Sequence, residues 1–337
     1  MVAIIGGGPA GLEAACTLAE NGLSVSLFEA KNEWAANLKN KFLLFPDFSP
    51  ADDILNCLTT KIDHDAILTY PNTEIIQVTK EKESWKLRDR NGNEYNASAV
   101  LMATGHEVFD AGRKEEFGFG IYEGVITSVQ MEQLFRSQQI KALMERTPHK
   151  RVVFLQCVGS RDEKTGNSYC SKICCVTAVK QAIELKKMIP EAEVFIFYMD
   201  LRMWGQHFEE LYSESQELYN IKYVRGRISE ASSTFDGRIG LKAEDTLIGQ
   251  PLRMTTDLLV LMVGIESSAG TQALAACCGI KGDYGFMQSK DAHLNDTQTC
   301  KAGLFLAGTC KRPMDISETI ADARSAALEI IKYLRHA

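Results

Sequence analysis

The hydrophobic pattern of the first thirty residues changes its period twice. Residues 2 to 5 are apolar and lead into the run Gly6-Gly7-Gly8-Pro9-Ala10-Gly11. The stretch LEAACTLAEN then carries apolar residues at helical spacing, and SVSLFE follows after Gly22. This order predicts a strand, a glycine loop, a helix closed by glycine and a second strand, which together form a βαβ unit.

The glycines of this unit have the G-x-G-x-x-G spacing of a dinucleotide-binding loop. Gly6 allows the tight turn, Gly8 lets the backbone approach a pyrophosphate, and Gly11 lets helix and strand pack closely. The helix start offers free N–H groups to phosphates, and Glu29 at the end of the second strand is placed to accept hydrogen bonds from ribose hydroxyls. The predicted cofactor-binding residues here are Gly6, Gly8, Pro9, Ala10, Gly11, Glu29 and Ala30.

Two distant segments favour FAD over NAD as the cofactor of this unit. ASAVLMATGHEVF predicts a strand that ends in Ala103-Thr104-Gly105, and GLFLAG predicts another strand that runs into a long amphipathic helix. Asp315 and Glu318 resemble a capping box, so the helix N-terminus could face the negative charge of a reduced flavin. The further predicted FAD-binding residues are Val78, Ala103, Thr104, Gly105, Gly308, Thr309, Asp315, Ile316 and Ser317.

These segments resemble the flavoproteins with two dinucleotide-binding domains, such as thioredoxin and glutathione reductases. The resemblance covers residues 1 to about 110 and about 252 to 337. It implies an α/β protein whose Rossmann-like FAD domain, 1–112 and 252–337, is split by an inserted second α/β domain, 113–251. An aspartate usually follows the strand before Gly308 in that class, and here Thr309 stands in its place.

The predicted insert has thiols where a second nucleotide loop is expected. RVVFLQC predicts its first strand and CCVTAVKQAIELKKMI its first helix, with no G-x-G-x-x-G between them. The connection instead contains Cys157, Cys170, Cys174 and Cys175, and a helix N-terminus makes thiolates easier to form. Four thiolates fit an iron-sulfur cluster or zinc. Zinc is less favoured because no CxxC knuckle is present, and scattered buried thiols are a third interpretation.

The motifs QCVGSRD, YCSKICC and AVKQA resemble the A subunit of heterodisulfide reductase, as do FGFGIYEGVITS, FYMDLRMWGQHFEELY and VRGR. The resemblance implies that the four cysteines hold one 4Fe-4S cluster close to FAD. It also implies partner subunits that handle electrons and disulfides, and a homodimer. The chain has no ferredoxin-type cysteine run, and it is most similar to the A subunit of the bacterial sulfur-oxidising complex, with the quinone-interacting flavoprotein as a related form.

Composition and charge limit the kinds of partner and the cellular compartment that are expected for such a protein. The 337 residues are 45% hydrophobic with a net charge of −7, so clustered phosphate contacts and a nucleic-acid partner are not expected. No apolar run approaches the roughly 20 residues of a transmembrane helix, and MVAIIGGG already forms a strand, which argues against a signal peptide. Ten cysteines are then expected to be reduced or metal-bound in the cytoplasm.

Several single residues carry weaker hypotheses. Lys180 shares the apolar face of its helix and could act catalytically by stabilising a reduced flavin or the thiolates, or its stem could extend to water. Arg202 and Arg225 could steer an acidic partner or pair with Asp200. Three residues lie near the second flavin strand: Lys311, Arg312 and His293. Each could contact the cofactor or belong to a solvated loop.

Two other functions compete with electron transfer within a complex. A pyridine-nucleotide-dependent disulfide reductase could use Cys174 and Cys175 as thiols, although the missing glycine loop weakens that interpretation. Alternatively, zinc could simply staple the insert of a binding scaffold. The six remaining cysteines, including the adjacent Cys277 and Cys278, lack ligand spacing and are predicted to be core thiols.

Overall fold

The computed structural model describes residues 1–82 and 84–336. Within it the chain divides into two compact units, each assembled from separate stretches of sequence. Unit 1 comprises Met1–Lys39, Asp52–Glu107 and Glu266–Ala337, and unit 2 comprises Asn40–Ala51 and Val108–Ile265. The domain boundaries predicted from the sequence, near residues 112 and 252, stay a prediction.

Unit 1 is built on a five-stranded parallel sheet of order β18-β7-β1-β2-β3. All residues of β1 and β2 are buried, as expected for central parallel strands covered on both faces. The strands are β1 Val2–Ile5, β2 Val25–Phe28, β3 Ile67–Tyr70, β7 Ala99–Met102 and β18 Leu304–Leu306.

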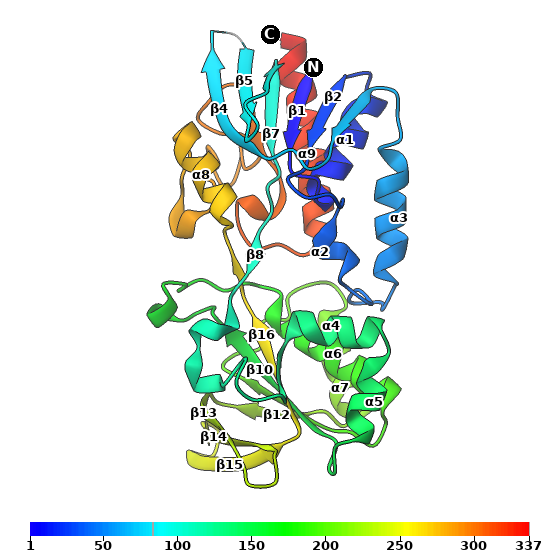
Figure 1. Ribbon diagram of the computed structural model, residues 1–337, viewed down its shortest axis with the longest axis vertical. Helices are drawn as coiled ribbons and strands as arrows, with labels where there is room; N and C mark the ends of the chain where they lie inside the picture. The colour runs from blue at the N-terminus through cyan, green and yellow to red at the C-terminus, as the bar shows by residue number, and fades with distance from the viewer. Residues whose placement is uncertain (83, 337) are drawn as a thin grey trace. The chain divides into compact units, whose positions relative to one another are not determined.

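The two faces of this sheet pack against different layers. The helices α1 (Pro9–Glu20) and α9 (Ile316–His336) lie together against one face (Figure 1). Alternate residues such as Ala3 and Ile5 share a core with the antiparallel strands β4 to β6 and helix α8. These elements are β4 Ile75–Glu81, β5 Ser84–Asp89, β6 Glu94–Ala97 and α8 Ala269–Cys278; α2 is Ala36–Lys39 and α3 is Ala51–Lys61.

Unit 2 repeats the parallel arrangement with the strand order β12-β11-β10-β16-β9. The register between β10 and β16 shifts after Leu155, where β10 runs into the cysteine loop. The strands are β9 Val125–Thr127, β10 Arg151–Val158, β11 Glu193–Tyr198, β12 Lys222–Arg225 and β16 Leu258–Val263.

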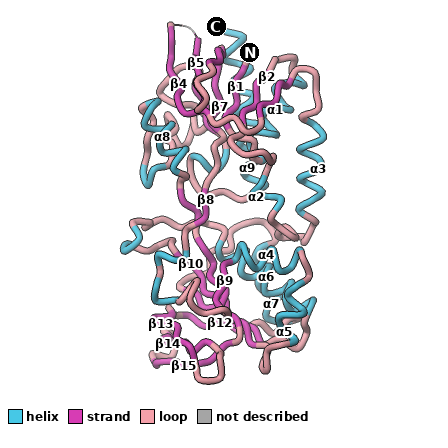
Figure 2. The backbone as a smooth tube through the Cα atoms, viewed as in Figure 1, coloured by secondary structure: helices cyan, strands magenta, loops and turns pink. Residues whose placement is uncertain are grey.

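Helices cover one face of the unit 2 sheet and an antiparallel three-stranded sheet covers the other (Figure 2). Phe42, Phe45 and Phe48 pack into the helix-side core, which explains why residues 40–51 belong to this unit. The helices are α4 Ser128–Arg136, α5 Gln139–Glu145, α6 Cys174–Met188 and α7 Phe208–Glu217, and the strands are β13 Ile228–Ser233, β14 Ile239–Asp245 and β15 Gln250–Thr256.

Besides the passages at residues 39–40 and 51–52, the chain passes between the units at two short strands, β8 (Glu107–Val108) and β17 (Ile265–Glu266), which pair with each other. Single 3₁₀ turns lie at Ala111–Arg113, Glu115–Phe117, Glu163–Thr165, Asp283–Gly285 and Gly308–Cys310. Across residues 1–82 and 84–336, none of the helices has both the length and the apolar composition to span a bilayer.

Candidate functional site

The glycine loop of unit 1 connects β1 to α1 and leaves no room for side chains at two positions. Gly6 has φ +114°, and a Cβ there would lie 2.2 Å from the Ala103 carbonyl oxygen. A Cβ on Gly11 would lie 1.8 Å from the carbonyl oxygen of Gly6. These two glycines are therefore required for the turn and for the close packing of the helix start, as the sequence predicts.

Open space lies over the third glycine of the motif. Gly8 is the N-cap of α1, with no atom within 4 Å of the place of a Cβ, and Pro9 and Ala10 are the first two residues of the helix. The Glu29 carboxylate holds the loop from the side, because it accepts hydrogen bonds from Gly7 N at 2.7 Å and Lys31 N at 2.8 Å. Ala30, beside it, is exposed. The result is a fixed backbone with an open face at the positive end of a helix.

The other predicted flavin segments of unit 1 converge on this loop. A Cβ on Gly308 would lie 2.9 Å from Ala10 and 3.3 Å from Thr319 of α9, so the starts of α1 and α9 meet at this glycine. Thr309 Oγ1 bonds to His106 Nδ1 at 2.9 Å, directly after the Ala103-Thr104-Gly105 turn. Sequence reasoning missed His106, whose only signal was its place next to Gly105.

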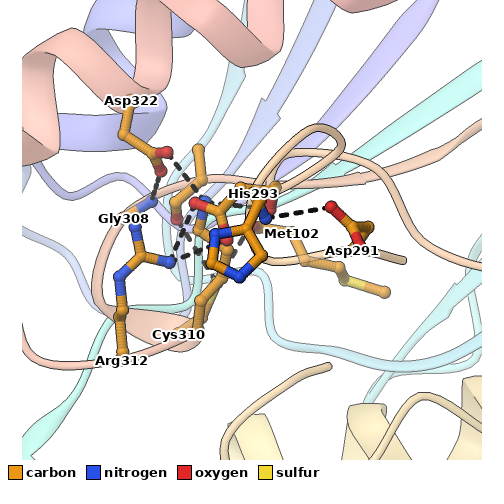
Figure 3. A network of polar contacts seen from close by, with 10 residues as sticks. Met102, Asp291, His293, Gly308, Cys310, Arg312 and Asp322 are labelled. Atoms are coloured by element: carbon orange, nitrogen blue, oxygen red, sulfur yellow. Dashed lines mark hydrogen bonds and ion pairs between the residues drawn. The ribbon is translucent and has the colours of Figure 1, made fainter. Parts of the chain in front are cut away.

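A buried ion network fixes the loop that follows β18 (Figure 3). Asp322 of α9 accepts hydrogen bonds from Gly308 N and from Lys311 Nζ, each at 2.7 Å. Lys311 also pairs with Asp296 at 2.8 Å, and its side chain is 2% exposed. Arg312 binds the same Asp296. Lys311 thus positions the glycine turn by ion pairs, and it is not part of a solvated loop.

The remaining predicted flavin residues lie on helix α9 and strand β4. Glu318 N donates to Asp315 Oδ1 at 2.8 Å and Asp315 N donates to Glu318 Oε2 at 3.2 Å, which confirms the capping box. Ile316 and Ser317 form the first turn of α9. Val78 is buried in β4, and its carbonyl accepts from the adjacent thiols of Cys277 and Cys278. His293 is exposed, and its backbone N–H donates to Asp291 Oδ1 in a surface loop (Figure 3).

The four predicted ligand cysteines lie in one region of unit 2. Cys157 is the second-last residue of β10 and has φ +61°, and Cys174 and Cys175 begin α6. Hydrogen bonds hold the intervening loop, because Ser171 Oγ accepts from Ile265 N at 2.8 Å and pairs with the Ser160 hydroxyl. Cys157 and Cys170 are half-buried, while Cys174 and Cys175 are buried.

Burial is the largest influence on the pKa of three of these thiols, those of Cys157, Cys174 and Cys175. It raises the pKa of Cys157 to about 12, with a further upward contribution from Cys175 and an opposing one from Arg161. Burial also raises the pKa of Cys174 and of Cys175. Burial thus opposes the ionisation that a helix start favours, and it holds the pKa of Cys157, Cys174 and Cys175 above the ordinary value for a thiol.

Cys157, Cys170 and Cys175 each contribute electrostatically to the raised pKa of Cys174, after the larger effect of burial. All ten cysteines are free. Among the described residues, no three or more His, Cys, Asp or Glu side chains are arranged as a ready-made site for a metal ion. Two nitrogen atoms near the thiols, Gln156 Nε2 and Arg161 Nη1, are buried without a hydrogen-bond partner, although Gln156 Oε1 accepts from Cys175 at 3.2 Å.

Lys180, on the same helix, lies inside unit 2. Its Nζ atom donates to the Leu43 carbonyl at 2.6 Å and to Glu132 Oε1 at 2.7 Å, and it is 3.3 Å from Glu184 Oε2. The side chain is 2% exposed, so it does not extend to water. Lys41 faces the same carboxylates, and burial lowers its pKa. A catalytic role of Lys180 stays a prediction.

Comparison with known proteins agrees with this architecture. Residues 1–158 match the Pyridine nucleotide-disulphide oxidoreductase family. The fold resembles thioredoxin reductase from Lactococcus lactis, with a TM-score of 0.67 at 16% identity over 100% of this chain and 99% of that one. Thioredoxin reductase from T. acidophilum gives the same TM-score at 18% identity, over 99% and 98%. The protein therefore has the α/β fold of thioredoxin reductases, with two domains of the dinucleotide-binding type.

Sequence relatives give a more specific likeness. The chain is 39% identical over 251 residues to the A subunit of the H2/formate:CoB-CoM heterodisulfide, ferredoxin reductase of Methanococcus maripaludis, covering 71% of this chain and 38% of that protein. It is 38% identical over 238 residues to the iron-sulfur A subunit of the CoB–CoM heterodisulfide reductase of Methanocaldococcus jannaschii, covering 68% and 36%. The chain is thus similar in sequence to heterodisulfide reductase A subunits, and it spans little more than a third of these relatives' length.

Proposed function

We propose that this chain is the FAD- and iron-sulfur-carrying electron-transfer subunit of a heterodisulfide reductase-like complex. One observation carries the proposal: four cysteines at the end of β10, in the loop after it and at the start of α6 lie where a dinucleotide-binding domain would have phosphate-binding glycines. This loop lacks the glycine motif that would bind a second pyrophosphate, whereas cysteine thiolates are the usual ligands of iron-sulfur clusters.

FAD fits the residues of unit 1. The open face over Gly8 at the start of α1 accommodates phosphate oxygens, and the second helix start, that of α9, reaches the same region at Gly308. Glu29 is held beside the loop, where it can accept a hydrogen bond from a ribose hydroxyl. Thr309, which is hydrogen-bonded to His106, stands where the flavoproteins that this chain resembles usually carry an aspartate.

The residues of the cysteine loop also fit a 4Fe-4S cluster. Cys157, Cys170, Cys174 and Cys175 would each bind a different iron, so their sulfur atoms need not converge as closely as the ligands of a single ion. The buried N–H groups of Gln156 and Arg161 lack partners in the protein and could donate to cluster sulfur. Cluster binding requires deprotonated thiols, whereas burial favours the protonated form. The free energy of iron binding would drive the release of these protons.

FAD accepts electrons in pairs and releases them singly, and a cluster accepts them one at a time. The protein's part is to hold these groups and to exclude water. The buried thiols and the ion pairs at Lys311 and Asp322 provide rigid supports for this purpose. Substrate chemistry on sulfur would take place on partner subunits, which explains why the chain needs no nucleophile–base pair of its own.

The finer assignment extends the resemblance to the bacterial sulfur-oxidising complex. In this proposal the chain works in the cytoplasm as a homodimer, together with iron-sulfur and disulfide-handling subunits, and passes on electrons from the oxidation of sulfur compounds. The quinone-interacting flavoprotein is the alternative within the same class.

The experiment is to purify the protein without oxygen, to count iron and FAD per chain, and to record electron paramagnetic resonance spectra after reduction. We expect one FAD and about four irons, a number that follows from one 4Fe-4S cluster. Cys157→Ser and Cys175→Ser should lose iron and keep FAD. Cys57→Ser, which alters an exposed thiol on α3 of unit 1, should keep both.

Two outcomes would replace the proposal. Zinc without iron would indicate a structural site. Rapid bleaching of the flavin by NADPH in the absence of partners, with neither metal bound, would indicate a disulfide reductase that uses Cys174 and Cys175.

A further inference from the structure

A cavity of about 630 Å³ opens in unit 2 beside the cysteine loop. It lies at the carboxyl ends of β11 and β12, and Met199, Asp200, Arg225 and Arg227 contribute to its wall, with Glu244 opposite. Ligands of parallel α/β sheets bind at the carboxyl ends of the strands. Neither the flavin nor the four-cysteine site accounts for this cavity.

The backbone that carries the two arginines is tightly held. Gly226 N donates to the Tyr198 carbonyl at 2.8 Å, and both the N–H and the hydroxyl of Thr246 donate to the Arg225 carbonyl, each at 2.8 Å. A Cβ on Gly226 would lie 1.8 Å from the Glu244 carbonyl oxygen, so only glycine allows this approach of the strands. Arg225 and Arg227 are therefore fixed at their Cα atoms on either side of a required glycine.

The guanidinium groups of these arginines use only part of their hydrogen-bonding capacity. Arg225 Nε donates to the Met199 carbonyl at 3.2 Å, while Arg227 Nε contacts Met199 Sδ at 2.7 Å and its Nη2 donates to the Arg161 carbonyl at 3.2 Å. Within residues 1–82 and 84–336, Nη1 and Nη2 of Arg225 and Nη1 of Arg227 make no hydrogen bond or ion pair. Both side chains are exposed and present N–H groups to an incoming acceptor.

Asp200 connects this cavity to the proposed cluster site. Its carbonyl accepts from the Cys175 thiol at 3.7 Å, and its carboxylate pairs with Arg161 at 2.6 Å and with Arg202 at 3.8 Å. The backbone N–H of Arg202 donates to the same thiol at 3.4 Å. Asp200 thus forms part of the cavity wall and also contacts Cys175, a predicted cluster ligand.

Positive charge is concentrated on this surface of an acidic protein. We define the arginine surface as Arg161, Arg202, Arg225 and Arg227 together with the cavity between them. The carboxylates of Asp200 and Glu244 offset two of the four positive charges, and Asp162, which interacts with Arg227, is itself paired with Lys114. The whole chain, in contrast, carries −7. A local field of the opposite sign to the net charge selects acidic partners and orients them as they approach.

We propose that the arginine surface is the docking site of an acidic one-electron carrier protein, whose carboxylates bind Arg225 and Arg227. This inference rests on the proposed function, because the cysteines beside the surface then supply the electron. Arg161 and Arg202 extend the positive charge beyond the cavity, so a broad acidic surface matches it better than a single phosphate. Trp204, two residues after Arg202 and 59% exposed, adds an aromatic side chain of the kind common in interfaces.

The redox step involves no bond changes. Each encounter moves one electron from the reduced protein to the oxidised carrier, so the protein is oxidised by one electron as one carrier molecule is reduced. The arginines place the carrier and take no part in the chemistry. Their effect should therefore appear in the association rate and depend on salt.

The test measures electron transfer from the complete protein, reduced with dithionite, to two acceptors in a stopped-flow instrument. Succinylated cytochrome c has an acidic surface and native cytochrome c a basic one, while both carry the same haem. The variants are Arg225→Gln and Arg227→Gln, singly and together. Arg253→Gln removes one exposed charge from β15 of the same unit and serves as the matched control.

At low salt we expect the double variant to reduce succinylated cytochrome c at least about tenfold more slowly than wild type, a loss within the range of electrostatic steering. The difference should vanish near about 1 M salt, where the Debye length is about 3 Å. Native cytochrome c should not lose rate in either single variant. Arg225→Lys keeps the charge and should stay close to wild type.

Unchanged rates with the acidic acceptor, or an equal loss in Arg253→Gln, would overturn the docking site. Iron and FAD are counted in every preparation, so the two hypotheses fail separately. A protein without iron refutes the proposed cluster, and the rates can still be followed through the flavin absorbance. A protein with full cofactors and no dependence on the arginines refutes the docking proposal alone.

Discussion

Glu184 on α6 offers a direct test of how unit 2 tolerates buried charge. Its carboxylate oxygens are buried and make no hydrogen bond, although Lys180 Nζ lies 3.3 Å from one of them. Burial raises the pKa of Glu184 from 4.5 to about 8, with Lys180 opposing and Glu132 reinforcing the rise. The folded protein therefore retains a proton that the unfolded chain releases. Replacement by Gln keeps the shape of the side chain and removes the titration.

The sign and the size of the effect follow from linkage. As the pH rises from 4.5 to about 8, the unfolded state ionises at Glu184 while the folded state does not, so the wild type loses stability across this window. A full rise of this size corresponds to about 5 kcal/mol as an upper bound, because each pKa unit is worth about 1.4 kcal/mol. Glu184→Gln should gain stability relative to wild type with increasing pH and level off above about pH 8.

Hydrogen exchange of peptides from α6 measures this gain, with variant and wild type compared at each pH so that intrinsic exchange rates cancel. Glu209→Gln changes an exposed carboxylate on the neighbouring helix α7 and should show no such trend. The reasoning is refuted if the difference between Glu184→Gln and wild type stays constant between pH 4.5 and about 8, or if Glu209→Gln behaves alike.

Two further changes probe the flavin loop and the buried lysine. Gly8→Ala places a methyl group in open space, so the protein should fold with a normal melting temperature and bind less FAD; Gly11→Ala, whose Cβ would lie 1.8 Å from a carbonyl oxygen, should lower the melting temperature itself. Flavin absorbance per chain and thermal unfolding separate the two effects. Lys180→Met removes the cation that pairs with buried Glu132 at 2.7 Å, while Lys41 still faces this carboxylate, and it should cost about 3–5 kcal/mol in urea unfolding. Equal stability of this variant and wild type would show that the ion pair contributes nothing.

The sequence predicted the flavin loop well because its signals are local. Gly6, Gly8 and Gly11 lie within six residues, and their spacing specifies one backbone path between β1 and α1. The capping box at Asp315 is equally local. His106 escaped prediction because its partner Thr309 is more than 200 residues away. The pairing of Lys311 with Asp296 and Asp322 also required the folded chain, since a lone lysine in a loop predicts exposure.

By itself, the amino-acid sequence indicated the main helices and strands, the glycine loop between β1 and α1, and the cysteines that lie where a second glycine loop is expected. The tertiary structure alone decided the environment of those groups. Residues 40–51 pack against the helices of unit 2, where the Leu43 carbonyl accepts a hydrogen bond from Lys180 Nζ. Arg225 and Arg227 line the same cavity as Asp200. Spacing along the chain encodes local geometry, whereas burial and the resulting pKa changes depend on contacts between distant segments that no short pattern specifies.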